Sequence, residues 1–99
     1  MAGFRHVVMF RWNENATEEH KRRLVDRLNA LPGDIPEIAD YRVGNDAGIN
    51  DGNHDFAVVA DFADRDAYLV YRDHPVHRAV IDEYVKPILA ERAAVQYDL

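Results

Sequence analysis

Hydrophobic and polar residues alternate along two stretches of the chain, and a period of two residues indicates β-strands. The first stretch covers residues 3–12, and one of its faces carries Phe4, His6, Val8, Phe10 and Trp12. The second covers residues 55–62, and one of its faces carries Phe56, Val58, Ala60 and Phe62. Shorter apolar runs at residues 38–44 and 93–97 predict two further strands.

Apolar residues recur at helical spacing between the first two strands. We predict a helix that begins at the N-cap Thr17 and runs to about Leu31, where Pro32 and Gly33 end it. Its predicted apolar stripe consists of Leu24, Val25, Leu28 and Leu31.

A second helical region follows the third strand, and the dipeptide His74-Pro75 interrupts it. Asp64 is its predicted N-cap. Pro75 suits the first position of a new helix, which we expect to continue to about Val85. The predicted buried positions of this region are Ala67, Leu69 or Val70, Tyr71, Val76, Ala79, Val80 and Tyr84.

His77 falls in the first turn of the segment that follows this break. The partial positive charge of a helix N-terminus disfavours imidazolium, so we expect a neutral His77 that can take up a proton near neutral pH.

The order strand, helix, strand, strand, broken helix, strand predicts an α+β fold of the ferredoxin-like βαββαβ type, with an antiparallel sheet and helices on one face. The 99 residues suit a single domain spanning 1–99. The uncovered face would carry Val7, Met9, Ala57 and Val59. An exposed apolar face of that size is unusual in a monomer, so we expect a homodimer that packs its sheets face to face.

Composition excludes several classes of function. The formal net charge of −6 argues against nucleic-acid binding and against anionic membrane surfaces, because both need a basic face. The chain has no cysteine, which removes disulfides, thiolate nucleophiles and cysteine metal sites. The apolar run Val7 to Phe10 is too short for a signal peptide, and no run has transmembrane length. We therefore expect a cytoplasmic protein.

Four segments resemble one known family. They are His6–Arg11 (HVVMFR), Tyr41–Asp46 (YRVGND), Asp55–Phe62 (DFAVVADF), and the pattern Tyr68-X-X-Tyr71-X-X-His74-Pro75-X-His77. Together they resemble the stress-responsive dimeric A/B barrel (Dabb) domain family over nearly the whole chain. The resemblance implies a ferredoxin-like monomer that dimerises through its sheets into an α/β barrel. It also implies a link to stress responses, although many members have no assigned activity.

One plant subgroup of that family cyclises linear polyketides by aldol condensation. The resemblance places three of its pocket residues at His6, Tyr71 and His77. The cyclases carry a further histidine early in the third strand, where this chain has Phe56. In some plant members, backbone carbonyls of the loop after the first helix hold magnesium; the matching positions are Pro32, Ile35 and Ile38. Carbonyl oxygens alone specify a metal weakly, so we expect no metal site. We also expect no organic cofactor, because the proton-transfer chemistry considered next needs none.

These observations lead to a pocket hypothesis. His77 would act as a base, and Tyr71 and His6 would orient a substrate or stabilise charge on its oxygen. The expected product is that of an aldol cyclisation or an isomerisation of a small apolar or aromatic ligand. The other residues expected to contact this ligand are Val8, Phe10, Leu24, Leu28, Phe56, Val58 and His74.

Other interpretations remain open at this point. The histidines could form a structural network in a non-catalytic stress-response or interaction protein. The fold would also suit a cofactor-free monooxygenase. His74 could cap a helix or pair with Asp73, whereas His20 and His54 are expected on the surface. A cavity of a few hundred Å³ near Tyr71 would favour the pocket, and a filled interior would favour the network.

Overall fold

The elements of the chain follow the predicted order in a computed structural model that describes residues 3–99. They are β1 (Phe4–Trp12), α1 (Glu18–Asp34), β2 (Ile38–Asn45), β3 (Phe56–Phe62), α2 (Arg65–Asp73), α3 (Pro75–Val80), a π-helical turn η1 (Ile81–Val85), a 3₁₀ turn η2 (Lys86–Ile88) and β4 (Leu89–Asp98).

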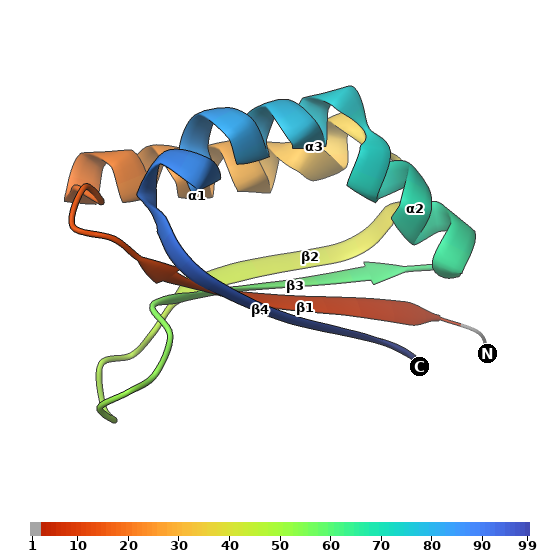
Figure 1. Cartoon of the computed structure of the whole chain (residues 1–99). Helices are drawn as coiled ribbons and strands as arrows, with labels where there is room; N and C mark the ends of the chain where they lie inside the picture. The colour runs from red at the N-terminus through yellow and green to blue at the C-terminus, as the bar shows by residue number, and fades with distance from the viewer. Residues whose placement is uncertain (1–2) are drawn as a thin grey trace.

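The four strands form one antiparallel sheet in the order β2-β3-β1-β4. The helices all lie against one face of this sheet, and the opposite face has no covering layer in the single chain (Figure 1). This arrangement confirms the predicted α+β, ferredoxin-like fold with an antiparallel sheet. β4 is an edge strand of the sheet. On its outer side no further strand follows, so only side chains separate the space under the helices from solvent.

The core lies between the sheet and the helices. The side chains of β1 alternate as predicted, and Phe4, Val8 and Phe10 are buried among apolar residues of β3. On α1 the residues that meet them are Leu24, Leu28 and Leu31, at helical spacing. Burial of one such side chain stabilises the fold by about 1.5–3 kcal/mol, so this layer accounts for the pairing of α1 with the sheet.

The helix N-termini carry the predicted caps. The Thr17 hydroxyl accepts the His20 backbone N–H, and the Asp64 carboxylate accepts that of Ala67. At the interruption, His74 Nδ1 accepts the Val76 N–H at 3.1 Å, so His74 caps the short helix α3.

The first helix is longer than predicted, because Pro32 lies inside α1 and the helix continues to Asp34. The Ile35 backbone N–H donates to the Leu31 carbonyl at 2.9 Å, which satisfies a carbonyl of the last turn and allows that turn to form beyond the proline.

Three predicted buried positions of the second helical region are exposed: the position assigned to Leu69 or Val70, both of which are exposed, and those of Val76 and Ala79. The inward side of α2 is set by Ala67, Tyr68 and Tyr71 instead. Beyond the break, the inward positions are His77, Val80, Ile81 and Tyr84. This spacing of three and four residues leaves Val76 and Ala79 on the solvent side. The α-helix ends at Val80, before the predicted end at about Val85, and η1 and η2 continue the helical region to Ile88.

The last strand is also longer than predicted. β4 pairs with β1 so that Arg92, Ala94 and Gln96 lie opposite Phe10, Val8 and His6. Cross-strand partners point to the same face of a sheet, so the helix-facing row of β4 is small or polar. The apolar alternation that identifies a buried strand is therefore missing from its first half.

The face away from the helices carries apolar cross-strand rows. Val7 lies between Val59 and Val95, and Met9 lies between Ala57 and Ala93. Val95 is 56% exposed and Met9 is 40% exposed in the single chain. Within residues 3–99, no helix is long and apolar enough to span a membrane.

Candidate functional site

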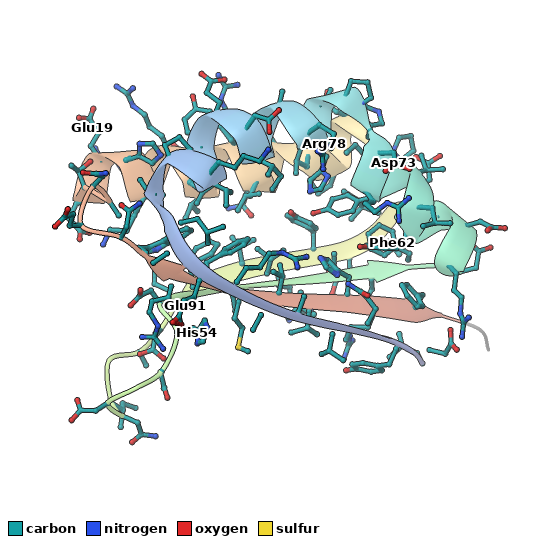
Figure 2. The ribbon with its side chains drawn as sticks, viewed as in Figure 1. Glu19, His54, Phe62, Asp73, Arg78 and Glu91 are labelled. Atoms are coloured by element: carbon teal, nitrogen blue, oxygen red, sulfur yellow. The ribbon has the colours of Figure 1, made fainter. Side chains whose placement is uncertain are left out.

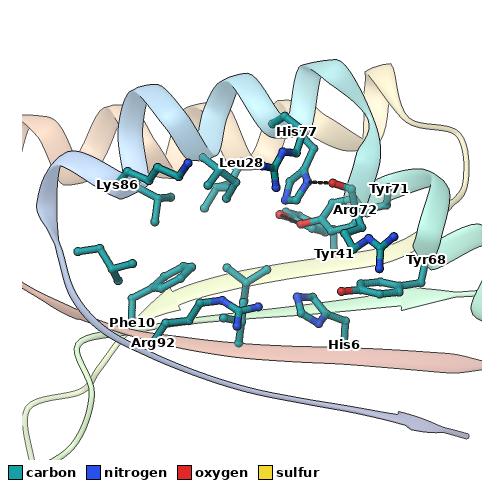
Figure 3. Close-up of a pocket in the computed structure, with 16 residues that line it drawn as sticks. His6, Phe10, Leu28, Tyr41, Tyr68, Tyr71, Arg72, His77, Lys86 and Arg92 are labelled. Carbon is teal, nitrogen blue, oxygen red and sulfur yellow. Dashed lines mark hydrogen bonds between the residues drawn. The ribbon is translucent and has the colours of Figure 1, made fainter.

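A cavity of about 340 Å³ lies between the sheet and the helices. Sixteen residues line it, and they come from all four strands and from the helical layer above them (Figure 3). Its interior includes His6, Tyr41, Tyr71 and His77, which surround an apolar surface of Val8, Phe10, Leu28 and Val58. The volume is within the range of small-molecule sites.

β4 forms one side of the cavity with two residues, Leu89 and Arg92. Its other residues paired with the helix-facing row of β1, Ala94 and Gln96, are exposed and do not line the cavity. Beyond Leu89 the edge strand therefore places no large apolar side chain on this side, and the long side chain of Arg92 carries its charge at the edge of the protein.

His6 is buried, with 4% of its surface exposed, and its tautomer follows from its neighbour. The Gln96 amide nitrogen lies 2.8 Å from His6 Nδ1. An amide N–H can only donate, so Nδ1 is the acceptor and Nε2 carries the proton. Burial, with smaller effects of the charges on Arg92 and His77, lowers the pKa of His6 to about 4. His6 is therefore a neutral ring with an Nε2–H donor.

His77 has the opposite tautomer. Its Nδ1 lies 3.2 Å from the backbone carbonyl of Arg72, which can only accept, so Nδ1 carries the proton and Nε2 has the free lone pair. Burial is the main cause that lowers the pKa of His77 below the ordinary value of 6.5, and the charge on Arg78 acts in the same direction. At neutral pH, His77 is an uncharged proton acceptor.

Tyr71 and Tyr41 form a hydroxyl pair beside the histidines, with 3.0 Å between their oxygens. Burial raises the pKa of Tyr41 to about 12 and that of Tyr71 far above its usual range, so both stay protonated. Whichever hydroxyl donates to the other, the pair keeps one O–H that can donate to a third group. Tyr68 adds an aromatic wall, with its ring centroid 5.0 Å from that of His6.

The structure brings together seven of the residues singled out from the sequence, since they all line the cavity: His6, Val8, Phe10, Leu28, Val58, Tyr71 and His77. Three others do not line it. Leu24 is fully buried one turn before Leu28, where α1 packs on the core. Phe56 stacks on Phe10 and Trp12 instead of facing the cavity. His74 is turned to its own helix, where it caps α3.

The remaining lining residues were not predicted from the sequence; they are Tyr41, Tyr68, Arg72, Arg78, Ile81, Val85, Lys86, Leu89 and Arg92. The tyrosines have the spacing of ordinary core residues. Four of the others are exposed arginines and lysines, which a single sequence does not distinguish from a solvated surface. One signal was available, because Tyr68 belongs to the family pattern that ends at His77.

The other histidines lie away from the cavity. His20, predicted to be a solvated surface residue, is half-buried, and its Nε2 lies 2.9 Å from the Tyr84 carbonyl, a contact that ties α1 to η1. His54 lies with Glu91 at the base of the loop that joins β2 and β3 (Figure 2). Its Nδ1 is 3.5 Å from the Arg11 guanidinium.

The described residues contain no group of three or more histidine, cysteine or acidic side chains that could hold a metal ion. Pro32, Ile35 and Ile38 match the positions whose carbonyls hold magnesium in some plant members of the family. In this chain the Ile35 carbonyl accepts a hydrogen bond from the Ile38 N–H at 3.1 Å.

Comparison with known proteins agrees with the fold. The chain superimposes on a dimeric ferredoxin-like protein of unknown function from Thermobifida fusca with a TM-score of 0.91 and 44% identity, covering 99% of this chain and 92% of that one. A dimeric protein of unknown function from Bacteroides fragilis gives a TM-score of 0.81 and 25% identity, with 98% and 96% covered.

The hydroxynitrile lyase from Passiflora edulis gives a TM-score of 0.86 at 17% identity, with 98% and 93% covered, and at that identity it shows a shared fold alone. No protein of curated function matches the chain. The stress-responsive A/B barrel domain matches residues 4–99, nearly the whole length. The chain therefore belongs to the stress-responsive A/B barrel (Dabb) domain family.

Proposed function

We propose that the cavity binds a small, largely apolar carbonyl compound and that His77 removes a proton from the carbon next to its carbonyl group. The observation that carries this proposal is the pair of opposite tautomers at one cavity: His77 presents a lone pair, and His6 presents an N–H. Removing a carbon-bound proton needs both a base and a donor to the oxygen that becomes negative.

His77 suits the role of base in two respects. Its lowered pKa keeps Nε2 unprotonated at neutral pH, and the Arg72 carbonyl holds the ring in the tautomer that leaves Nε2 free. A base whose pKa lies somewhat below the working pH is almost fully in its active form. After the transfer, the imidazolium keeps the same Nδ1–H contact to that carbonyl.

His6 and the tyrosine pair suit the role of donors. The proton of His6 on Nε2 and the unused O–H of Tyr71 and Tyr41 are available for the enolate oxygen. All three groups stay neutral, His6 and Tyr71 are buried and Tyr41 is half-buried, so they are oriented before the reaction begins. In aldol cyclisation the enolate carbon attacks a second carbonyl of the same molecule, and the new alkoxide takes the proton back from His77. In isomerisation the conjugated enolate takes that proton back at a different carbon from the one that lost it.

A purely structural role for the histidines accounts less well for these contacts. Within residues 3–99, each ring has a side-chain or backbone partner on Nδ1, and neither Nε2 has one. Neither Nε2 is a buried atom without a partner, so each can reach solvent or a ligand, which a network serving only to tie the helix break to the sheet would not require. The arrangement supports a ligand that completes the hydrogen bonding.

We also propose that the protein is a homodimer that joins the uncovered sheet faces into a barrel. The apolar rows centred on Val7 and Met9 support this interface, and the protein from Thermobifida fusca, 44% identical, is described as dimeric. The cavity lies on the other side of the sheet, so the dimer would leave it unobstructed.

The test of the proton transfer requires no knowledge of the natural substrate. Acetophenone in D₂O exchanges its methyl protons slowly, and the loss of the methyl proton NMR signal measures exchange. We expect the protein to accelerate this exchange and His77→Gln to abolish the acceleration, while His54→Gln, outside the cavity, retains it. An acceleration that His77→Gln leaves intact, or none with any aryl or alkyl ketone, would contradict the proposal.

A further inference from the structure

The cavity is cationic at its outer edge in a protein that is acidic as a whole. The formal net charge is −6, yet four of the 12 lysines and arginines line this one cavity. We call them the cationic rim: Arg72, Arg78, Lys86 and Arg92. Among residues 3–99, no aspartate or glutamate lines the cavity. A local field of this sign attracts anions.

Two members of the cationic rim already have a carboxylate partner. Arg72 holds Asp73 through two contacts of 2.9 and 3.1 Å, and Lys86 lies 2.8 Å from Asp82. Arg78 and Arg92 have no carboxylate within ion-pair distance in the part of the chain that the structure describes. Of these two, Arg78 acts on the carboxyl groups of Asp73 and Asp82, whose pKa values it helps to lower. Within the cationic rim, Arg92 is thus the residue least compensated by carboxylates.

Arg92 is also well placed to meet a ligand. It comes from the edge strand, opposite Phe10, on the side of the sheet that faces the helices. Its side chain lies along the floor of the cavity between Phe10 and His6 (Figure 3). Its charge contributes to the lowered pKa of the buried His6, so the field of the guanidinium reaches the interior. An anion bound there would lie at the boundary between the apolar surface and the histidines.

We infer that the ligand of this cavity is an organic carboxylate with an aryl or alkyl body, and that Arg92 binds the carboxylate. This inference rests on the proposed function, because it names the class of compound that the same cavity receives. The apolar body would contact Val8, Phe10, Leu28 and Val58. A guanidinium matches the two oxygens of a carboxylate through parallel N–H donors.

A monoanion fits better than a phosphate ester. A phosphate dianion is held by several cations or by backbone N–H groups at a helix N-terminus. Here, within the described residues, Arg78 and Arg92 have no carboxylate at ion-pair distance, but the charge of Arg78 also acts on Asp73 and Asp82. At the start of α3 the Val76 N–H is already taken by the His74 side chain. One uncompensated guanidinium balances one carboxylate charge.

The test compares three probes that share a phenyl body: hydrocinnamate, its neutral amide hydrocinnamamide, and phenethyl phosphate. Isothermal titration of the unmodified protein gives the three dissociation constants. We expect hydrocinnamate to bind about tenfold more tightly than the amide, the scale of a charge-assisted hydrogen bond. Arg92→Gln should weaken hydrocinnamate about tenfold and leave the amide unchanged, and Arg92→Lys should recover part of the loss.

Arg22→Gln is the matched control, because Arg22 is an exposed arginine of α1 outside the cavity and its loss changes the net charge equally. Hydrocinnamate binding that falls equally in both variants would overturn the inference, since the effect would then be one of overall charge. Equal binding of acid and amide would overturn it and leave the proposed proton transfer standing. Tighter binding of the phosphate would also overturn it. Hydrocinnamate binding lost in Arg92→Gln, together with no acceleration of ketone exchange, would support the ligand class and contradict the proposed reaction.

Discussion

Tyr71 and His77 stack on each other across the break between α2 and α3, with ring centroids 4.1 Å apart and an angle of 30° between the ring planes. The same break brings the Arg72 carbonyl to His77 Nδ1. The last turn of α2 therefore fixes the imidazole twice, once by ring packing and once by a hydrogen bond. Because Pro75 starts a new helix at this point, both contacts depend on the local sequence between Tyr71 and His77.

Tyr71→Phe should separate the packing role of this ring from its hydroxyl. The phenylalanine keeps the contacts with His77 and Phe62, and it loses the hydrogen bond to Tyr41. We expect the free energy of unfolding to fall by about 1 kcal/mol, the net contribution of one hydrogen bond, as measured by urea denaturation. Ketone exchange should slow, because the remaining Tyr41 hydroxyl is no longer held in place. An unchanged exchange rate would remove the tyrosine pair from the proposed mechanism.

The pH dependence of ketone exchange should report His77. Only the neutral imidazole accepts a proton, so the rate should rise with pH through the pKa of His77 and then stay level. Because burial lowers that pKa, the midpoint should lie below the ordinary 6.5. Rates measured from acid to neutral pH, with circular dichroism to verify folding at each pH, provide the profile. A midpoint above 6.5 would mean that another group acts as the base.

His6 should make the fold sensitive to acid. Its pKa is about 4 in the folded chain and near 6.5 in an unfolded one, so between these values the unfolded state binds more protons. Stability is then highest above pH 6.5 and falls as the pH drops toward 4. The loss over this window amounts to about 3 kcal/mol. Urea denaturation at several pH values should show the slope, and His6→Gln should reduce it. A slope that is the same in His6→Gln would assign the acid sensitivity to other groups.

His74 and His77 differ in role although both belong to the His-Pro-X-His element. His74 caps α3 through Val76 N–H and does not line the cavity. We expect His74→Ala to lower the free energy of unfolding by about 1 kcal/mol, as the loss of a helix cap does, and to leave ketone exchange nearly unchanged. His74→Asn, which can still cap the helix, is the matched control and should keep most of the stability. Loss of exchange in both variants would indicate that His74 contacts the substrate.

The fold could be predicted from the sequence because its inner strands alternate strictly. On β1 and β3, one face packs against helices and the other carries apolar rows. The alternation of their side chains therefore indicates that both are strands and which face of each is inward. The incorrect predictions concern α2, α3 and β4, elements that pack against the rest of the protein on one side only. On α2 and α3, several apolar residues lie on the solvent side, and at β4 an edge strand carries Arg92 and Gln96 where a central strand would carry large apolar residues.

The site could be predicted only in part, for a related reason. His6, Tyr71 and His77 are titratable or polar residues on inward faces, which single them out in a sequence. Their tautomers depend on Gln96 and the Arg72 carbonyl, and a sequence does not reveal such contacts. Leu28 lines the cavity and Leu24 does not, because the two lie on successive turns of α1 and only the turn of Leu28 is next to the cavity. A sequence does not show which turn that is.

The proposed dimer can be tested by one pair of substitutions. Val95 is 56% exposed on the uncovered sheet face, beside Val7, whereas Val70 is 45% exposed on α2. Both are valines that the single chain leaves open to solvent, so Val95→Asp and Val70→Asp should disturb the monomer fold little. A buried, unpaired carboxylate is strongly unfavourable, so only Val95→Asp should break an interface formed by the sheets.

Sedimentation velocity at micromolar concentration should therefore show a dimer for the unmodified chain and for Val70→Asp, and a monomer for Val95→Asp. A monomer in all three samples would exclude the dimer at that concentration, and a dimer in all three would place the interface elsewhere. The cavity is on the helix side of the sheet, and no residue of the apolar rows lines it. If the site is complete within one chain, monomeric Val95→Asp should still bind hydrocinnamate, and lost binding would indicate that the dimer holds β4 in place beside the cavity.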